Sequence, residues 1–411
     1  MSSRSHASRG GSIPGEEIEF HPHSFADPAG RVFRWQGQLY RGLRSPSADF
    51  FAELARSARL ADLVRDGLLV DFEPAELRIE GFDLVMRHPA VPFPSYPHEW
   101  GCAMLRDAAL VILTLAAELA ERGLTLKDSH PWNVLYRGSR PVWVDLTSVG
   151  PRDKRPGWPP EREFRRFCLN PLALMASGHD RMARYLLPDK DGVSDDDLAR
   201  LAGSRSVLRT QSSRLRRRPR TELDVLAALR REVEALRLPS PPEVSTEPAP
   251  VGADDARPLL EQAAAGWVME IDPSSAWLAR PAGERGWQTA WACSSPGMAD
   301  GLYRLVRGSA GTLPLVVDFV DPTPRRGIEG HWQLAATDRL RADAVVSLDH
   351  GRTGISPDQR AAGLAAFANR LLIAGCASDE LAHFERALAT RFARVRVVTS
   401  GAQGAVLAAE R

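Results

Sequence analysis

The C-terminal part of the sequence alternates short apolar segments with helix-like segments, and this pattern constrains the fold more than any other feature. Strand and helix in repeated alternation indicate a parallel sheet whose crossover connections are helices. Strands are expected at Trp267–Ile271, Trp287–Ala292, Leu313–Asp318, Ala342–Leu348 and Leu371–Ala374, and helices at about 296–307, 357–370 and 378–391. Two more strands with a glycine-containing turn, "FARVRVVTSGAQGAVLAAE", end the chain. We therefore predict an α/β, Rossmann-like domain over residues 257–411.

The N-terminal part has a different order of elements, which predicts an α+β domain over residues 19–187. The segment "RVFRWQGQLYRGL" alternates apolar and polar residues around Gly37 and predicts a hairpin. A helix is expected behind Ser47 as its N-cap, and it should end at Gly67. Two short strands near residues 69–72 and 82–87 and a long helix over about 104–122 complete the pattern, and residues 159–187 look helical.

The remaining segments are expected to lack a core of their own. Residues 1–18 have no apolar stretch and indicate a disordered leader rather than a secretory signal. Residues 188–256 shift from acidic to Arg-rich to Pro-rich and predict a linker with one helix over 221–238. The Arg-rich tract at 204–220 holds seven arginines, which could contact phosphates but are more typical of a solvated linker.

Composition limits the possible partners and compartment. The formal net charge of +1 gives no global attraction to nucleic acid or to an anionic membrane. The longest apolar run, residues 108–117, is about half of the ~20 residues that span a bilayer, so no membrane segment is expected. The four cysteines lie too far apart for paired metal ligands or a disulfide framework, and no metal site is predicted. We therefore expect a cytoplasmic protein.

One loop motif has the spacing of a catalytic site. Asp128 and Asn133 are five residues apart, and Asp145 follows the apolar strand "PVWV". In protein kinases an Asp accepts the substrate hydroxyl proton, an Asn five residues on binds metal, and an Asp after a short strand binds magnesium. No lysine precedes Lys127, and Arg41 is the candidate for the place of the missing kinase lysine. Alternatively, the three side chains are turn-forming residues that satisfy backbone groups.

Three longer stretches carry a family resemblance. They are "YRGLRSPSADFFAELARSARLADLVRDGLLV", "VPFPSYPHEWGCAMLRDAALVILTLA" and "GLTLKDSHPWNVLYRGSRPVWVDLTSV". They resemble bacterial class I S-adenosylmethionine-dependent methyltransferases that carry a kinase-like N-terminal region, a group that includes nodulation-type methyltransferases. The resemblance covers about residues 25–180 and, more weakly, 265–356. It implies a kinase-like domain over 19–187, a class I methyltransferase-type domain over 257–411, and S-adenosylmethionine as the cofactor.

The first cofactor-binding turn of such enzymes departs from the family pattern in this sequence. The family's first strand runs into an acidic-x-Gly-x-x-x-Gly turn, because only glycine lets the backbone approach the cofactor. Here "WVMEIDPSSAWLA" keeps the acid as Glu270 but places Asp272 and Ala276 where the glycines should be. The Asp272 carboxylate would approach the cofactor's own carboxylate, which is an unfavourable contact unless paired. The resemblance assigns cofactor contacts to Glu270, Asp272, Ser274 and Ala276.

The other site residues implied by the resemblance follow later strands. The second strand should end in an acid that holds the ribose hydroxyls, and here Ser295 stands near that place, a weaker partner than a carboxylate. Asp318 could accept from the adenine amino group, although a strand-end turn residue explains it equally well. Asp349 and His350, just past the fourth strand, are the catalytic candidates; the alternative is an exposed loop histidine.

Three functions therefore remain open from the sequence. The first is a methyltransferase that modifies a small or carrier-bound metabolite near His350. The second is a non-catalytic protein of the same fold that has lost cofactor binding and acts on a protein partner, as the altered turn suggests. The third is a kinase-like phosphotransferase using Asp128, Asn133 and Asp145.

Overall fold

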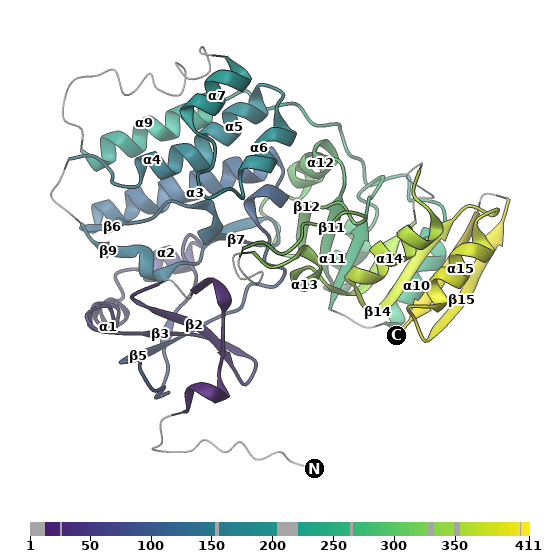
Figure 1. Ribbon diagram of the computed structural model, residues 1–411, viewed down its shortest axis with the longest axis horizontal. Coiled ribbons are helices and arrows are strands. Elements are labelled where there is room, and N and C mark those ends of the chain that lie inside the picture. The colour runs from purple at the N-terminus through teal and green to yellow at the C-terminus, as the bar shows by residue number, and fades with distance from the viewer. Residues whose placement is uncertain are drawn as a thin grey trace.

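The computed structural model describes residues 13–24, 27–152, 156–203, 221–263, 266–327, 333–348, 354–402 and 404–411. The chain forms a small N-terminal sheet, a cluster of helices next to it, and a C-terminal α/β unit beside the helical cluster (Figure 1). Within the described residues, no helix is long and apolar enough to cross a membrane.

The N-terminal sheet is antiparallel, with the strand order β1-β2-β3-β5-β4. Its strands are β1 (Glu19–Phe20), β2 (Gly30–Trp35), β3 (Gln38–Leu43), β4 (Glu73–Pro74) and β5 (Leu84–His88). The predicted hairpin is confirmed, since β2 and β3 are joined by Gln36 and Gly37. Their φ angles of 47° and 76° are both positive, as in the two-residue turns that fit the twist of paired strands. Two helices, α1 (Ser47–Ser57) and α2 (Ala61–Arg65), connect β3 to β4.

Helix α3 (Cys102–Glu121) is the centre of the helical cluster, and its prediction from sequence is confirmed. Its run of apolar residues is buried on most of its circumference, as expected for a helix that is apolar all round. The helices around it are α4 (Glu161–Phe164), the π-helical turn η6 (Arg165–Leu169), α5 (Asn170–Ala176), α6 (Asp180–Leu186), α7 (Asp195–Ala202) and α9 (Glu222–Ala235). Two short strand pairs complete this part: β6 (Leu124–Leu126) with β9 (Val149–Pro151), and β7 (Val134–Arg137) with β8 (Arg140–Trp143).

The C-terminal sheet has seven strands in the order β12-β11-β10-β13-β14-β16-β15. These are β10 (Trp267–Ile271), β11 (Gln288–Cys293), β12 (Thr312–Val316), β13 (Ala342–Ser347), β14 (Ala368–Cys376), β15 (Arg394–Gly401) and β16 (Gly404–Glu410). The first five run parallel, while β16 is antiparallel to both β14 and β15. The α/β architecture predicted from the alternating pattern is confirmed.

Helices cover both faces of the C-terminal sheet. They are α10 (Ala253–Gln262), α11 (Ala279–Arg285), α12 (Pro296–Val306), α13 (Ala336–Arg339), α14 (Pro357–Phe367) and α15 (Leu381–Ala389). Helices α10 and α11 share a buried cluster with Val268 on one face, whereas α14 and α15 share one with Leu372 on the other. Helix α12 packs on the sheet through Ala299 and Leu302 and also contacts α3 (Figure 1).

Three details of the sequence prediction need correction. The expected single helix over 47–67 is two helices, because Ala58 adopts a left-handed conformation with φ of 51°, and Pro46 rather than Ser47 is the N-cap of α1. The expected linker holds α7 as well as α9, and both pack against the helical cluster. Residues 13–18 of the expected disordered leader are ordered, since Ile13 is buried and pairs with Ile79; residues 1–12 and the Arg-rich tract 204–220 lie outside the described residues.

A carboxylate from the C-terminal unit caps the N-terminus of α3. The N-cap residue of α3 is Gly101, which has no side chain to accept the free amide hydrogens. Asp300 of α12 accepts them instead, from Cys102 N at 3.1 Å and Ala103 N at 3.0 Å. A Cβ atom at position 101 would lie 2.1 Å from Asp300 Oδ1, so glycine is required for this approach. The two halves are therefore joined through a helix terminus.

We predict that Asp300→Ala lowers the free energy of unfolding by about 1–2 kcal/mol, because the α3 amides lose their only side-chain cap among the described residues. Urea unfolding of the whole chain measures this change. Asp300→Asn keeps one acceptor oxygen and should cost less than the alanine variant. An alanine variant as stable as the original chain would contradict the capping role.

Candidate functional site

The carboxyl ends of the parallel strands bring several of the predicted cofactor residues to one edge of the C-terminal sheet. Ligands of open α/β sheets bind outside the carboxyl ends of the strands. Asp272 follows β10, Ser295 follows β11 and Asp318 follows β12, and these three strands are neighbours in the sheet. The arrangement places the three side chains along the edge where the sequence predicted a cofactor.

Asp272 adopts a backbone conformation that favours glycine, and its side chain reaches the end of the neighbouring strand. Its φ angle is 48°, in the left-handed region that favours glycine, and its N–H donates to Ala292 O at 2.8 Å. Its carboxylate accepts hydrogen bonds from Ser294 N at 2.6 Å and from Ser294 Oγ at 2.9 Å. The turn therefore has a backbone conformation that favours glycine, and the Asp272 carboxylate lies at the end of β11, where the sequence itself has no acid.

Glu270 lies inside the domain, below this turn. Its side chain is 2% exposed and accepts hydrogen bonds from Trp277 Nε1 at 2.5 Å and from Trp291 Nε1 at 3.1 Å. Burial raises the pKa of Glu270 to about 8, although the two indole hydrogen bonds act in the opposite direction. The carboxyl group thus anchors the strand and the following turn from within the core. No sequence pattern predicts that Trp277 and Trp291 enclose this carboxyl group.

The end of the turn is covered by the Pro-rich segment that precedes α10. Ala276 is fully buried, and its N–H donates to Ser245 O at 2.8 Å, while Ser275 Oγ donates to Pro248 O at 3.1 Å. The same segment contacts α12, where a Cβ atom at Gly301 would lie 2.6 Å from Val244 Cγ2. Ser274 is exposed between these contacts. The packing of this segment was missed, because its composition predicts only a linker.

Ser295 and Asp318 have local structural partners. Ser295 is the N-cap of α12, and its Oγ accepts from Met298 N at 3.3 Å. Asp318 Oδ1 accepts from Val320 N at 2.9 Å and from Asp321 N at 3.3 Å, which is the strand-end turn that the sequence left as an alternative. The two catalytic candidates, Asp349 and His350, lie outside the described residues.

The D-x4-N loop of the N-terminal half is held by internal hydrogen bonds. Asp128 Oδ1 accepts from His130 N at 2.6 Å, and Asp128 Oδ2 accepts from Asn133 Nδ2 at 2.9 Å. Burial, followed by the nearby Glu163 carboxylate, raises the pKa of Asp128. Glu163 itself accepts from Ser129 N at 2.7 Å. Glu163 comes from α4 and has no sequence signal that would link it to the loop.

Asp145 belongs to a second, charged cluster. Arg41 Nη1 on β3 lies 3.0 Å from Asp145 Oδ1 and 3.2 Å from Asp27 Oδ2, so Arg41 pairs with both carboxylates. Thr147 Oγ1 donates within the same cluster and lies 2.8 Å from Asp145 Oδ1. Burial and the Arg41 charge lower the pKa of the adjacent His88 to about 4. Within the described ranges, no group of three His, Cys, Asp or Glu side chains is placed to hold a metal ion.

The two most distinctive sequence motifs, "PFPSYPHEW" and "LKDSHPWNV", meet at the junction of the two halves. Tyr96 from the first motif packs on Trp132 from the second, with ring centroids 4.4 Å apart. Arg339 of α13 packs on the Tyr96 ring, with Cζ 3.7 Å from the ring centroid. It also forms a buried ion pair with Glu99. The spacing within either motif does not predict this contact, because Tyr96, Trp132 and Arg339 are far apart in sequence.

The chain is similar to one curated protein and to several solved structures. No family model matches the sequence. The chain is 33% identical over 187 residues to "Nodulation protein NoeA" of Rhizobium meliloti (strain 1021), a match that covers 44% of this chain and 39% of that protein. The chain therefore spans about two fifths of the length of this relative.

Two of the solved structures that resemble the chain are named as methyltransferases. One is the T. thermophilus 16S rRNA N2 G1207 methyltransferase (RsmC) in complex with AdoMet and guanosine, with a TM-score of 0.30, 16% identity, and coverage of 40% of this chain and 44% of that chain. Another is the magnesium protoporphyrin IX methyltransferase (ChlM) from Synechocystis PCC 6803, with a TM-score of 0.28, 17% identity, and coverage of 38% and 77%. These scores are too low to support an argument, so the α/β assignment rests on the strand order of the chain itself.

Proposed function

We propose that the C-terminal unit is a class I methyltransferase-type domain that binds S-adenosylmethionine and methylates a small or carrier-bound metabolite. The support is its architecture: a parallel sheet finished by an antiparallel hairpin, β15 and β16, as in the family that the sequence resembles. Similarity to the nodulation protein over part of the chain agrees with that resemblance. Methyl transfer needs a nucleophile in line with the sulfonium methyl group and exclusion of water, and little covalent help from the protein.

Asp272 is the observation on which this proposal depends most. Family members need a glycine-like turn after the first strand and an acid at the end of the second strand. Asp272 meets both needs, because its φ angle of 48° gives the turn and its carboxylate lies against Ser294. A carboxylate in this place could accept hydrogen bonds from both ribose hydroxyls. We therefore assign the ribose contact to Asp272 rather than to Ser295.

We predict that Asp272→Asn weakens S-adenosylmethionine binding about tenfold or more, since an amide cannot replace a charged acceptor for two hydroxyls. Equilibrium dialysis with the labelled cofactor measures the dissociation constant of both proteins. The matched control is Asp358→Asn, an exposed carboxylate on α14 that pairs with His383. Equal affinities of the Asp272 variant and the original chain would remove Asp272 from the site.

A non-catalytic role is the second candidate, and the Pro-rich segment favours it. Residues 242–248 contact the turn after β10 through Ser275 and Ala276, so the chain itself covers part of the turn that should face a cofactor. In that case the fold would serve a protein partner instead of a reaction. Absence of S-adenosylmethionine binding at millimolar concentration would favour this role.

We also propose that the N-terminal half is a kinase-like domain that no longer transfers phosphate. The support is the antiparallel sheet followed by the loop of Asp128 and Asn133, with Arg41 on the third strand paired with Asp145. The kinase lysine is replaced by arginine, and the Asp128 carboxylate is already bonded to Asn133 and His130. Magnesium-dependent nucleotide binding that is lost in Asp145→Asn would contradict this proposal and favour phosphotransfer, the third candidate function.

A further inference from the structure

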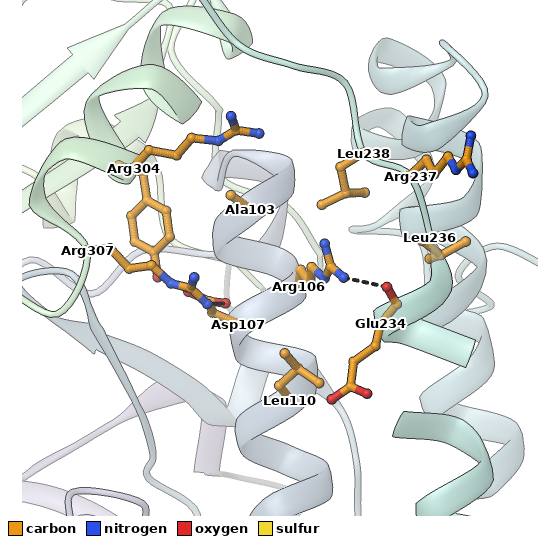
Figure 2. A pocket seen from close by; sticks show the side chains of 11 residues that line it. Ala103, Arg106, Asp107, Leu110, Glu234, Leu236, Arg237, Leu238, Arg304 and Arg307 are labelled. Atoms are coloured by element: carbon orange, nitrogen blue, oxygen red, sulfur yellow. Dashed lines mark hydrogen bonds and ion pairs between the residues drawn. The ribbon is translucent and has the colours of Figure 1, made fainter. Parts of the chain in front are cut away.

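A groove runs between the two halves of the molecule, away from the proposed cofactor edge. It has a volume of about 630 Å³ and is lined by α3, by the end of α9 with the residues that follow it, and by the C-terminal part of α12. Figure 2 shows Arg106 of α3 facing the α9 side of the groove and Arg304 and Arg307 on the α12 side. Because α12 begins at the carboxyl end of β11 and ends before β12, its C-terminus lies at the opposite edge of the parallel sheet from Asp272.

Positive charge exceeds negative charge in this groove. Four arginines and two acids line it. Asp107 is neutralised by Arg307, with Nε 2.7 Å from Oδ2, and it also accepts from Tyr303 Oη at 2.6 Å. The carboxylate of Glu234 lies 3.7 Å from Arg230, which is outside the groove. Both acids are therefore already compensated.

Three of the arginines have no carboxylate partner within the described residues. Arg106 donates to the carbonyl oxygen of Glu234 at 2.7 Å, which caps the end of α9 but leaves the guanidinium charge uncompensated. Arg304 and Arg237 are exposed, and in the described chain they have neither an ion pair nor a side-chain hydrogen bond. Arg304 lies in the last turn of α12, where the helix dipole favours a cation, but no carboxylate compensates its charge among the described residues.

A second cavity shares a wall with the groove and contains a buried donor without a partner. Its volume is about 580 Å³, and it shares Asp107, Leu110, Tyr303 and Arg307 with the groove. Arg137 Nη2 lies in its wall, is buried, and has no hydrogen-bond partner. A buried guanidinium nitrogen that is left unpaired costs free energy, so an acceptor that reached from the groove into this second cavity would satisfy it.

We propose that this interdomain groove binds a ligand that carries a pyrophosphate group, either free or esterified to a small organic body. Guanidinium groups match phosphoryl oxygens in geometry and hold them through paired hydrogen bonds. Two linked phosphoryl groups carry enough charge to compensate Arg106 and Arg304, which line the groove. The volume of the groove is in the range of small-ligand sites. Among the described residues that line it, the aromatic side chain is that of Tyr303, which is buried and cannot stack on a base. The proposal does not depend on methyltransferase activity.

Calorimetric titration of the full chain with inorganic pyrophosphate and, separately, with ADP at low ionic strength tests this site. Pyrophosphate binding as strong as that of ADP would indicate that the pyrophosphate group alone is recognised, and tighter ADP binding would indicate an ester. In both cases Arg304→Gln and Arg106→Gln should each weaken binding about tenfold. Arg304 is exposed, so its replacement leaves the core untouched.

The matched control is Arg56→Gln, an exposed arginine on α1 that pairs with Glu53 far from the groove. Its affinity for both ligands should equal that of the original chain. The proposal is overturned if neither ligand binds at millimolar concentration. It is also overturned if binding occurs but is the same in the Arg304 and Arg106 variants, because the ligand then occupies another site.

Discussion

Replacing Arg339 by methionine is expected to lower the free energy of unfolding by about 3–5 kcal/mol. Arg339 and Glu99 form an ion pair whose side chains are 2% and 1% exposed, and it joins α13 to the N-terminal half. Burial opposes ionisation of Glu99, yet the Arg339 charge keeps the pKa of Glu99 below its usual value. Without Arg339, the Glu99 carboxylate would be a buried charge with no cation to pair with it. Urea unfolding of the whole chain measures the loss.

A double variant separates the ion pair from the packing around it. Glu99→Gln combined with Arg339→Met removes both charges, so it should be more stable than Arg339→Met alone. The control is Arg325→Met, because Arg325 pairs with Asp338 at an exposed position where such pairs contribute less than about 1 kcal/mol. A loss below about 1 kcal/mol in Arg339→Met would mean that this pair does not hold the two halves together.

Glu270→Gln is expected to become more stable than the original chain as the pH rises from 5 to 9. Burial raises the folded pKa of Glu270 from 4.5 to about 8. A carboxyl group with a raised folded pKa contributes its stability fully below the unfolded pKa and loses it as the pH rises through the folded value. Glutamine does not ionise, so the variant avoids this loss. The difference in unfolding free energy should grow by roughly 2–4 kcal/mol over that interval.

Chemical unfolding at pH 5, 7 and 9 measures this difference. Glutamine keeps one acceptor for the indoles of Trp277 and Trp291, so the variant should fold at all three values. Glu284→Gln, on the surface of α11, corrects for the general effect of removing a carboxylate. A difference that stays constant or shrinks with pH would show that Glu270 is ionised in the folded protein.

The sequence predicted the C-terminal sheet well, because each strand is a short continuous apolar run. The segments between the strands instead space their apolar residues at helical intervals. The strands β10, β11, β12 and β13 fall within two residues of the expected bounds at each end. Helices α10 and α11 were not predicted, since Pro258 and Pro281 interrupt their patterns and proline argues against a helix interior. The local sequence pattern therefore predicts the strands but not the short helices α10 and α11.

The candidate site was less accessible from the sequence, because its important contacts join distant segments. The position of Asp272 in the family's glycine place was visible, but the hydrogen bonds to Ser294 depend on the pairing of β10 with β11. The cover of the turn by Ser245 also depends on tertiary packing that no local signal shows. Pattern and spacing identify which residues can act, whereas the fold determines which of them meet.

Calorimetric titration of the original chain with S-adenosylmethionine and S-adenosylhomocysteine tests the central claim most directly. The proposed function predicts one site per chain with a dissociation constant below about 100 µM, which corresponds to roughly 5–6 kcal/mol of binding free energy. The absence of binding heat up to millimolar concentration, in protein shown to be folded, would contradict a cofactor site at the carboxyl ends of β10 and β11.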